Sequence, residues 1–580
     1  MASPAIPRRE YAMCAALALA FFVMYGAHAC RTVSLNGDSA ELVTAAALWG
    51  VPHAPGYPLF TAFGHLFAAL PVLTVAGRVH LTSAVFHAAT VGFTAATVLE
   101  ATRSRLAGAA AGCALGTAKT FVLGSLYAEV FPLNDLFFAA LFFLAVRLRA
   151  FPSPARALGF AALAGLASAH HMMIALAAPA LAILLLGPLL RLVRTRPATL
   201  GLLVLAFLVP FATSYALVPL AASRDPALSW GDVHDTASFL AVVTRHDYGG
   251  LFSSVHGAGH GSGPERLVAL GEILGDSFGP FTLAAALGGA IVLLRRSGDR
   301  SLGLALVTAA IVVGPVFAWA NALGTATEVG LAHFARFATM AHLPVALAAG
   351  AAVPFLGELA RRFAPPLGAR AGIAALVVWV ALGAIHAFPI DLHDDRRGEA
   401  FAHDLVLHSP DRSLLLLSGD APNQAALYVC AVEHLCGERV ALSPGSLFLP
   451  WAMAQARRRH PEITIPWTNG PGLKRTHEIV AAEIARRPVF AYPDLLEKDP
   501  LLQTAFRPLP DLLLFRLWPL GSENAAMRAA LDASAQAMAG GGCEGCRLPP
   551  PEAHPTQEMQ LVHAYEAARV NHARAASALP

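Results

Sequence analysis

The chain has 580 residues, of which 56% are hydrophobic and only 14% are charged, and its mean hydropathy is +0.56. Soluble domains carry about 25% charged residues, so this composition excludes an ordinary soluble protein and predicts a multi-pass α-helical membrane protein. The net charge is only +3, but almost all basic residues are Arg, and they occur in short clusters between apolar segments. That pattern relates to membrane topology and gives no indication of nucleic-acid binding.

Basic residues gather in the loops that stay on the cytoplasmic side of a membrane. Arg8 and Arg9 precede the first apolar segment, residues 11–29, so we expect the N-terminus inside and residue 31 outside. A cleaved signal peptide is the alternative for residues 1–29, and it also leaves Asp38 outside. Placing the later Arg clusters inside predicts about eleven membrane helices, near residues 11–29, 80–101, 106–125, 131–148, 157–172, 173–190, 198–220, 277–294, 301–320, 337–358 and 371–388.

The first external loop, residues 31–79, contains two apolar stretches that are too short to span a membrane. We expect residues 40–49 and 58–70 to form amphipathic helices that lie in the membrane interface. The turn "HAPGYP", residues 53–58, separates them. The second large external loop is residues 221–276, and both loops belong to a transmembrane domain that extends over residues 1–390.

After Pro389 the composition becomes more polar, and short buried strands such as "SLLLLSGD" and "PVFAYPD" alternate with helical segments. This alternation predicts a small extracytoplasmic α/β domain over residues 391–520. Residues 521–580 are predicted to be a flexible tail with a terminal amphipathic helix. Cys430/Cys436 in the domain and Cys543/Cys546 in the tail are two pairs that an oxidising compartment would allow to bridge. Arg-rich, Ala-rich usage suggests a bacterial source, which would make the membrane the inner (plasma) membrane and the outside the periplasm.

Ionisable residues in or beside membrane helices are costly, and function is the default hypothesis for them. In the predicted topology, polar residues from four segments meet on the outer side. Asp38 also has a structural alternative, because Asp is a favoured N-cap for a helix that begins near Ser39. The four groups are Asp38, Glu41, His53 and Tyr57; Glu129 and Asn134; His170 and His171; and Arg245 and His246.

A carboxylate just after the first membrane helix, at the outer membrane interface, could act on a substrate whose tail lies in lipid and whose head group lies outside. For a polyprenyl-phosphate sugar, an acceptor hydroxyl attacks the anomeric carbon, and Asp38 can take its proton as general base. The leaving lipid phosphate needs cationic or N–H donors. Candidates for that role are Arg245, His246, His171 and Arg336.

The motifs "GDSAEL", "GVPHAPGYPLF", "SLYAEVFPLNDLF", "GLASAHHMM" and "LSWGDVHDTASFLAVVTRHDYG" occur in that order. Together they resemble a multi-pass family that was long known only as a domain of unknown function. That family includes an animal protein O-mannosyltransferase and is related to the GT-C glycosyltransferases. The resemblance covers about residues 10–250. Its acidic pattern falls on Asp38 and Glu41, its His-x-Pro-Gly-Tyr-Pro turn begins at His53, and its Glu-to-Asn pattern spans Glu129 to Asn134.

The resemblance implies a GT-C-like fold and an inverting glycosyltransferase with Asp38 and Glu41 as catalytic residues. It implies a lipid-linked, mannose-like donor and a hydroxyl acceptor on protein Ser/Thr or an envelope glycan. Some GT-C enzymes use a divalent metal and others do not, so Mg²⁺ or Mn²⁺ at Asp38, Glu41 and Glu129 stays open. Two other functions also stay open: a transporter or lipid flippase, and a non-catalytic membrane assembly protein.

Overall fold

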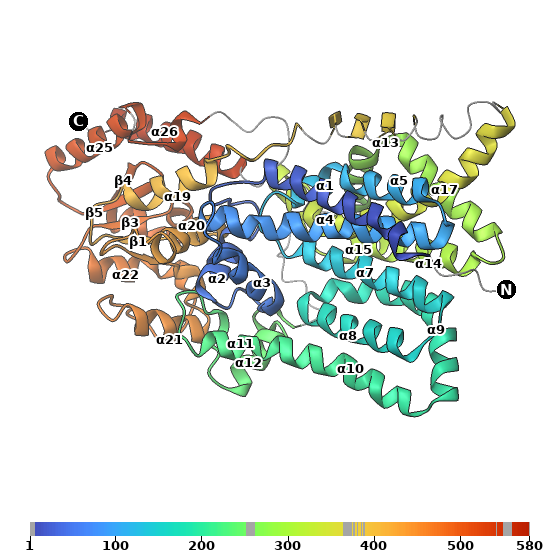
Figure 1. The fold of residues 1–580 in the computed structure, drawn as a ribbon. Coiled ribbons are helices and arrows are strands. Elements are labelled where there is room, and N and C mark those ends of the chain that lie inside the picture. The colour runs from blue at the N-terminus through green and yellow to red at the C-terminus, as the bar shows by residue number, and fades with distance from the viewer. Residues whose placement is uncertain are drawn as a thin grey trace.

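The computed structural model describes residues 6–250, 262–363, 389–540, 542–548 and 559–578, with scattered positions between 374 and 386. Long helices form a bundle at one end of the molecule, a sheet domain lies at the other end, and two short helices lie between them (Figure 1). The helices of the bundle and its loops are α1 (Ala12–His28), α4 (Val75–Thr102), α5 (Arg105–Gly116), α6 (Lys119–Gly124), α7 (Phe131–Ala150), α8 (Pro154–His170), α9 (Ala178–Thr195), α10 (Ala198–Tyr215), α11 (Leu217–Ala222), α12 (Thr236–Val243), α13 (Gly263–Arg295), α14 (Arg300–Ile311), α15 (Phe317–Ala320), α16 (Glu328–Phe337) and α17 (His342–Phe363).

The described residues contain eight helical segments that are long and apolar enough to cross a membrane. Each coincides with one of the predicted membrane helices, so the prediction of a multi-pass α-helical membrane protein is confirmed. The segments are Arg8–His28, Val75–Thr102, Phe131–Ala150, Met172–Thr195, Ala198–Ala222, Gly263–Arg295, Arg300–Ala320 and Glu328–Leu359.

The three remaining predicted helices are shorter or lie elsewhere. Residues 106–125 form two helices, because α5 ends at Gly116 and α6 begins at Lys119. The carbonyl of Gly116 accepts a hydrogen bond from the Tyr25 hydroxyl at 2.7 Å. Residues 157–172 form α8, which has 17 residues. Residues 371–388 lie largely outside the described residues, so the count of eleven stays a prediction.

Two short helices follow the first membrane helix, as predicted: α2 (Ser39–Leu48) and α3 (Pro58–Ala68). The prediction that both lie in the membrane interface is wrong for α2, because its residues from Ser39 to Ala46 are all buried. Helices α3 and α4 pack against it, together with α20 (Asp420–Ala431) from the sheet domain. Helix α3 keeps exposed apolar side chains, among them Leu66 at 64% exposure.

The sheet domain contains a five-stranded sheet in the order β2-β1-β3-β5-β4. Strand β1 pairs in parallel with β2 and β3, and β5 pairs antiparallel with β3 and β4. The predicted α/β character is therefore present. Its elements are α19 (Arg397–Leu407), β1 (Leu414–Leu416), α20, β2 (Val440–Leu442), α21 (Pro450–Arg459), α22 (Thr476–Glu483), β3 (Val489–Ala491), α23 (Pro493–Lys498), α24 (Leu501–Thr504), β4 (Phe506–Asp511) and β5 (Leu514–Pro519).

The tail predicted to be flexible contains two helices, α25 (Asn524–Gly540) and α26 (Met559–Ala578), and both pack on β4. Met527 and Leu531 of α25 are buried beside Leu509 of β4, which explains why the helix stays on the sheet. Disulfides join Cys430 to Cys436 and Cys543 to Cys546. Both cysteine pairs considered in the sequence are thus bridged.

Candidate active site

One half of the candidate site is an ion network that joins three distant parts of the chain. Asp38 immediately precedes α2, Glu129 lies just before α7, and Arg336 lies in α16. Nη1 of Arg336 is 3.0 Å from Oδ2 of Asp38 and also forms an ion pair with Oε1 of Glu129. The backbone N–H of Asp38 donates to the same Glu129 oxygen at 3.3 Å. One guanidinium therefore holds two carboxylates.

The backbone at Gly37 permits this close approach. Gly37 has a φ of +59°, and a Cβ there would overlap Oε1 of Glu129 and Nη1 of Arg336. Glycine is the residue that adopts this conformation at no steric cost. Asp38 occupies the N-cap position of α2, but its side chain makes no capping hydrogen bond. The alternative that Asp38 acts only as an N-cap is therefore wrong.

Burial and charge set the protonation of this network. The side chains of Glu129 and Arg336 are almost fully buried, whereas the Asp38 side chain is 25% exposed. Burial raises the pKa of Asp38, but the positive charges of Arg336, His53 and His333 outweigh it and hold that pKa at about 2. Burial raises the pKa of Glu129 above its ordinary value. Asp38 is therefore ionised at neutral pH, and it is the more accessible of the two carboxylates that Arg336 holds.

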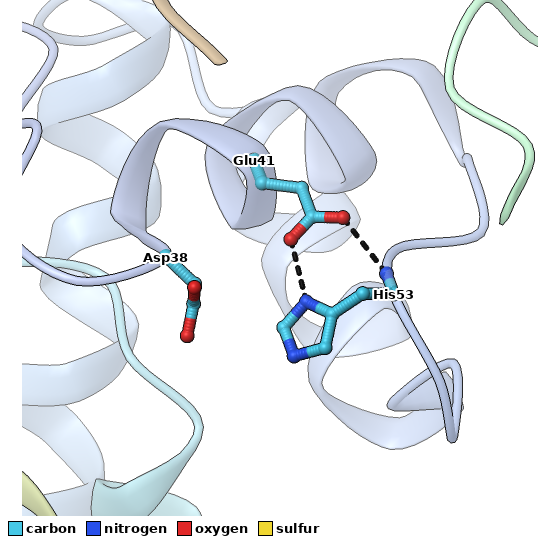
Figure 2. A group of neighbouring side chains, drawn as sticks. All are labelled: Asp38, Glu41 and His53. Atoms are coloured by element: carbon cyan, nitrogen blue, oxygen red, sulfur yellow. Dashed lines mark hydrogen bonds and ion pairs between the residues drawn. The ribbon is translucent and has the colours of Figure 1, made fainter. Parts of the chain in front are cut away.

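The other half of the site is a pair formed by Glu41 of α2 and His53 of the following turn (Figure 2). Nδ1 of His53 donates to Oε2 of Glu41 at 2.6 Å, and the His53 backbone N–H donates to Oε1 at 2.8 Å. Burial lowers the pKa of His53, but the negative charge of Glu41 outweighs it and raises that pKa to about 9. At neutral pH the imidazole is therefore protonated.

The turn after His53 explains why the sequence carries "HAPGYP". The Ala54–Pro55 peptide is cis, and the next two residues, Gly56 and Tyr57, have φ values of +89° and +35°. The N–H of Gly56 donates to the carbonyl of His53 at 2.9 Å, which closes the turn. Glycine adopts a positive φ at no steric cost, which suits it to position 56 of this turn. The turn holds His53 beneath Glu41 and starts α3 at Pro58.

A divalent metal, if bound, would be held by a different set from the one predicted. Asp38, Glu41 and His53 offer ligand atoms that all lie within 4.8 Å of one another (Figure 2). Glu129, which was a candidate ligand in the sequence, is not in this group; its carboxylate pairs with Arg336 and accepts from the backbone N–H of Asp38. Two carboxylates and an imidazole suit Mn²⁺ better than Mg²⁺, which prefers oxygen ligands alone.

Of the other predicted residues, Tyr57 and His171 lie beside His53, whereas His170 and Asn134 lie in the interior of the protein. The rings of Tyr57 and His171 stack at 5.8 Å, and the His53 ring lies 5.1 Å from Tyr57. His170 is buried and donates from Nε2 to the Val130 carbonyl at 2.8 Å. Asn134 is buried, and its Nδ2 contacts the sulfur of Met340 at 3.6 Å. His170 and Asn134 therefore have interior packing contacts.

The two residues predicted from the second external loop differ in placement. The Arg245 guanidinium lies 5.2 Å from the ring centre of Tyr248, on the outer wall of the site. The side chain of His246 is 80% exposed, and among the described residues its ion-pair partner is Asp247, at 3.9 Å. The structure gives His246 no contact with Asp38, Glu41 or His53. We therefore do not place it with the donor-binding residues.

A cavity of about 170 Å³ lies directly beside the ion network. Arg336 lines it together with Lys119, whose Nζ is 2.6 Å from Oδ2 of Asp276. Lys119 was not among the predicted site residues, so its place beside this cavity is new. Other lining residues include Asn36, Tyr127, Glu272, Leu331 and Ile390.

Sequence reasoning also missed Asp420, at the N-terminus of α20 in the sheet domain. Burial and the negative charges of Asp38 and Glu41 raise its pKa, so its carboxyl group shares their electrostatic environment. Asp420 directly follows the carboxyl end of β1, in the sequence "SGD". In parallel sheets, ligands bind at the carboxyl ends of the strands, and this rule could have identified the position.

Comparison with known families supports the predicted resemblance. Residues 38–188 match the family model described as the protein O-mannosyl-transferase TMEM260 N-terminal domain. The family resemblance is confirmed. The match begins at Asp38 and includes Glu41, His53 and Glu129, whereas Arg336 and the sheet domain lie beyond it.

Two curated relatives carry the same name. The chain is 29% identical over 460 residues to protein O-mannosyl-transferase TMEM260 of Mus musculus, which covers 74% of this chain and 62% of the mouse protein. It is 31% identical over 114 residues to the Dictyostelium discoideum protein, which covers 19% of this chain and 14% of that one. The chain thus spans less than two thirds of the length of these relatives.

Among solved structures, the chain is similar to ArnT from Cupriavidus metallidurans. The structure bound to undecaprenyl phosphate has a TM-score of 0.58 at 13% identity, and the match covers 88% of this chain and 98% of ArnT. The apo structure has a TM-score of 0.56 at 12% identity, with coverages of 87% and 96%. At such low identity the likeness establishes the fold, and it confirms the predicted GT-C-like architecture.

Proposed function

We propose that this protein is a GT-C-type glycosyltransferase that moves a mannose-like sugar from a polyprenyl-phosphate donor to a hydroxyl acceptor. The observation that carries the proposal is the Asp38 carboxylate. It is partly exposed, ionised, and held by Arg336, which also lines the neighbouring cavity. The names of the curated relatives favour mannose and a protein hydroxyl. The undecaprenyl phosphate named for ArnT favours a polyprenyl donor.

In the proposed reaction, the acceptor hydroxyl attacks the anomeric carbon while the bond from that carbon to the phosphate oxygen breaks. Asp38 takes the hydroxyl proton, and the bonding electrons leave with the lipid phosphate. A single displacement of this kind inverts the anomeric centre. Positioned proton transfer contributes about 10²–10⁴-fold to such rates.

The lipid phosphate would occupy the cavity beside Arg336 and Lys119. Both cations already have carboxylate partners, yet Nε of Arg336 is buried and has no hydrogen-bond partner among the described residues. A buried donor without an acceptor is costly, so a phosphate oxygen that accepts from it is stabilised. This role for Arg336 retains one of the predicted phosphate ligands.

Protonated His53 would stand beside Asp38 as a second cation, oriented by both oxygens of Glu41. Its charge favours the ionised form of Asp38 and can stabilise negative charge on the donor. If the site takes a metal, Asp38, Glu41 and His53 would hold it, and the ion would supply additional positive charge for the leaving phosphate. His53 would then have to give up its proton to serve as a ligand.

The site and the sheet domain would face the periplasm of an inner (plasma) membrane, where a lipid-linked sugar presents its head group. The acceptor would be a protein Ser/Thr or an envelope glycan. Asp420, at the N-terminus of α20, is the carboxylate of the sheet domain whose pKa responds to Asp38 and Glu41, so it is a candidate for contact with the acceptor.

The test is sugar transfer by the purified 580-residue chain in nanodiscs, with an envelope-protein extract and radiolabelled polyprenyl-phosphate mannose, glucose or arabinose in separate assays. We expect Asp38→Asn to reduce transfer by about 10²–10⁴-fold. Asp394→Asn is the matched control, because that side chain is 99% exposed and its carboxylate should be dispensable. If the wild type transfers no mannose, glucose or arabinose, the proposal is wrong. Equal transfer by wild type and Asp38→Asn would support the glycosyltransferase activity but would show that Asp38 is not its general base.

A further inference from the structure

Helix α21 of the sheet domain docks on the second external loop of the membrane domain. Both terminal nitrogens of Arg458 contact the carboxylate of Asp232, at 2.7 and 3.1 Å. Nη2 of Arg459 donates to Asp225 at 3.1 Å, and Nε2 of Gln455 donates to the Ser229 carbonyl at 3.1 Å. A two-point Arg–carboxylate contact fixes orientation as well as distance. Helix α21 of the sheet domain therefore fixes the position of this loop.

A second contact between the two parts is centred on one carboxylate oxygen. Oδ2 of Asp247 accepts from the indole N–H of Trp230 at 3.1 Å and from the indole N–H of Trp451 at 3.0 Å. Trp230 belongs to the external loop and Trp451 to α21, and their rings are 5.1 Å apart. The Asp247 side chain is 16% exposed. Hydrogen bonds to an ionised acceptor are stronger than neutral ones, so Asp247 joins the two parts firmly.

The same loop segment forms the aromatic wall beside His53. Tyr248, next to Asp247, stacks on Trp230 with ring centres 6.0 Å apart. The His53 ring lies 6.5 Å from Trp230 and 6.4 Å from Tyr248. The loop is also pinned to the strand-like segment before His53, because the N–H of Trp230 donates to the Val51 carbonyl at 2.9 Å. A shift of the loop would therefore move the wall against which His53 packs.

We propose that Trp451 is a positioning residue that acts through Asp247. Through this contact the sheet domain holds the rings of Trp230 and Tyr248 in place beside His53. The catalytic consequence rests on the proposed glycosyl transfer. The structural consequence, a loop held in place from α21, does not depend on it. Small displacements of groups around a reacting centre reduce rates strongly, which is why a residue outside the ion network can matter.

The test compares Trp451→Phe with Trp518→Phe in the 580-residue chain in nanodiscs. Trp451→Phe keeps an aromatic ring and removes the N–H that Asp247 accepts. Trp518, on β5 of the same domain, has an indole nitrogen that is buried and has no hydrogen-bond partner among the described residues, which makes it a matched control. Two measurements are made on each variant: backbone hydrogen exchange of residues 236–248 by mass spectrometry, and kcat/KM for sugar transfer.

For Trp451→Phe we expect faster exchange in residues 236–248 and a loss in kcat/KM of about tenfold, the size expected for one hydrogen bond to a charged group. Trp518→Phe should change neither. Asp247→Asn keeps an acceptor oxygen without the charge, and we expect it to fall between Trp451→Phe and the wild type in both measurements.

Unchanged exchange in Trp451→Phe would overturn the proposal, and so would faster exchange with wild-type kcat/KM. A wild type that transfers no sugar would refute the proposed function instead. In that case the exchange data alone would decide whether α21 holds the loop, so the two failures can be told apart.

Discussion

The two carboxylates at the start of α2 stand three residues apart but depend on very different parts of the chain. Glu41 meets His53, only 12 residues away. Asp38 meets Glu129, 91 residues away, and Arg336, 298 residues away. The Glu41 half of the site is therefore local and is built by one turn. The Asp38 half forms only when three elements are packed together: α2, the segment that precedes α7, and α16. Substitutions in the Asp38 half should therefore change the stability of the fold more than substitutions in the Glu41 half.

The largest expected effect follows from removing the central cation. Arg336→Met keeps an unbranched apolar stem but removes the guanidinium, which leaves Glu129 buried and Asp38 partly buried without this positive partner. Removing one partner of a buried ion pair costs about 3–5 kcal/mol, so we expect a loss of that order in the free energy of unfolding at pH 7. Unfolding by SDS in mixed micelles measures it.

The control is Arg475→Met, which breaks a more exposed pair with Glu478. Exposed pairs contribute about 0–1 kcal/mol, so this variant should unfold almost like the wild type. Equal stability of the two variants would contradict the view that the Asp38 half supports the fold.

The next effect concerns the glycine that allows the carboxylates to approach. Gly37→Ala adds a Cβ that would overlap Glu129 and Arg336 at a φ of +59°. We expect a loss of about 1–3 kcal/mol from the overlap, in addition to about 1–2 kcal/mol from the left-handed backbone. Gly521→Ala separates the two terms, because its φ is +84° and a Cβ there meets nothing within 4 Å. If both variants lose the same stability, the overlap at Gly37 costs nothing.

A smaller effect is expected in the Glu41–His53 half of the site, as a change in how the melting temperature depends on pH. Because Glu41 raises the pKa of His53 to about 9, the pair stabilises the folded protein fully below the ordinary histidine pKa of about 6.5. That stabilisation is lost as pH rises through about 9. Glu41→Gln should lower the melting temperature below pH 6.5 and flatten its fall between about pH 6.5 and 9.

Melting temperatures between pH 5 and 10 test this expectation. Asp394→Asn, beside the more exposed His393, should leave the wild-type curve unchanged. A wild-type melting temperature that does not fall between about pH 6.5 and 9 would show that the Glu41–His53 pair is not charged as inferred.

The smallest effect is expected at His246, which the sequence placed among the donor-binding residues. Its side chain is 80% exposed, so His246→Ala should change stability by no more than about 0.5 kcal/mol and transfer by no more than about twofold. A tenfold loss of transfer would contradict this expectation and would place His246 among the residues that the reaction needs.

Sequence patterns predicted much of this protein because their physical causes are local. The apolar lengths of the membrane helices, the turn at "HAPGYP" and the strands at "SLLLLSGD" and "PVFAYPD" each depend on neighbouring residues. The hairpin of β4 and β5 was not predicted, because β4 contains Pro508 and Pro510 and proline argues against an interior strand. These prolines lie on β4, the edge strand of the sheet, where proline is tolerated.

The sequence by itself determined the class of the protein, its family resemblance and the candidate carboxylates, because these follow from composition and from motifs of a few residues. Only the tertiary structure decided which charges meet. It paired Glu129 with Arg336, grouped His53 with Asp38 and Glu41, buried α2, and brought Asp420 and Trp451 from the sheet domain toward the site. The physical reason is that a charge selects its partner by distance in space, and no local pattern encodes a contact that spans 298 residues.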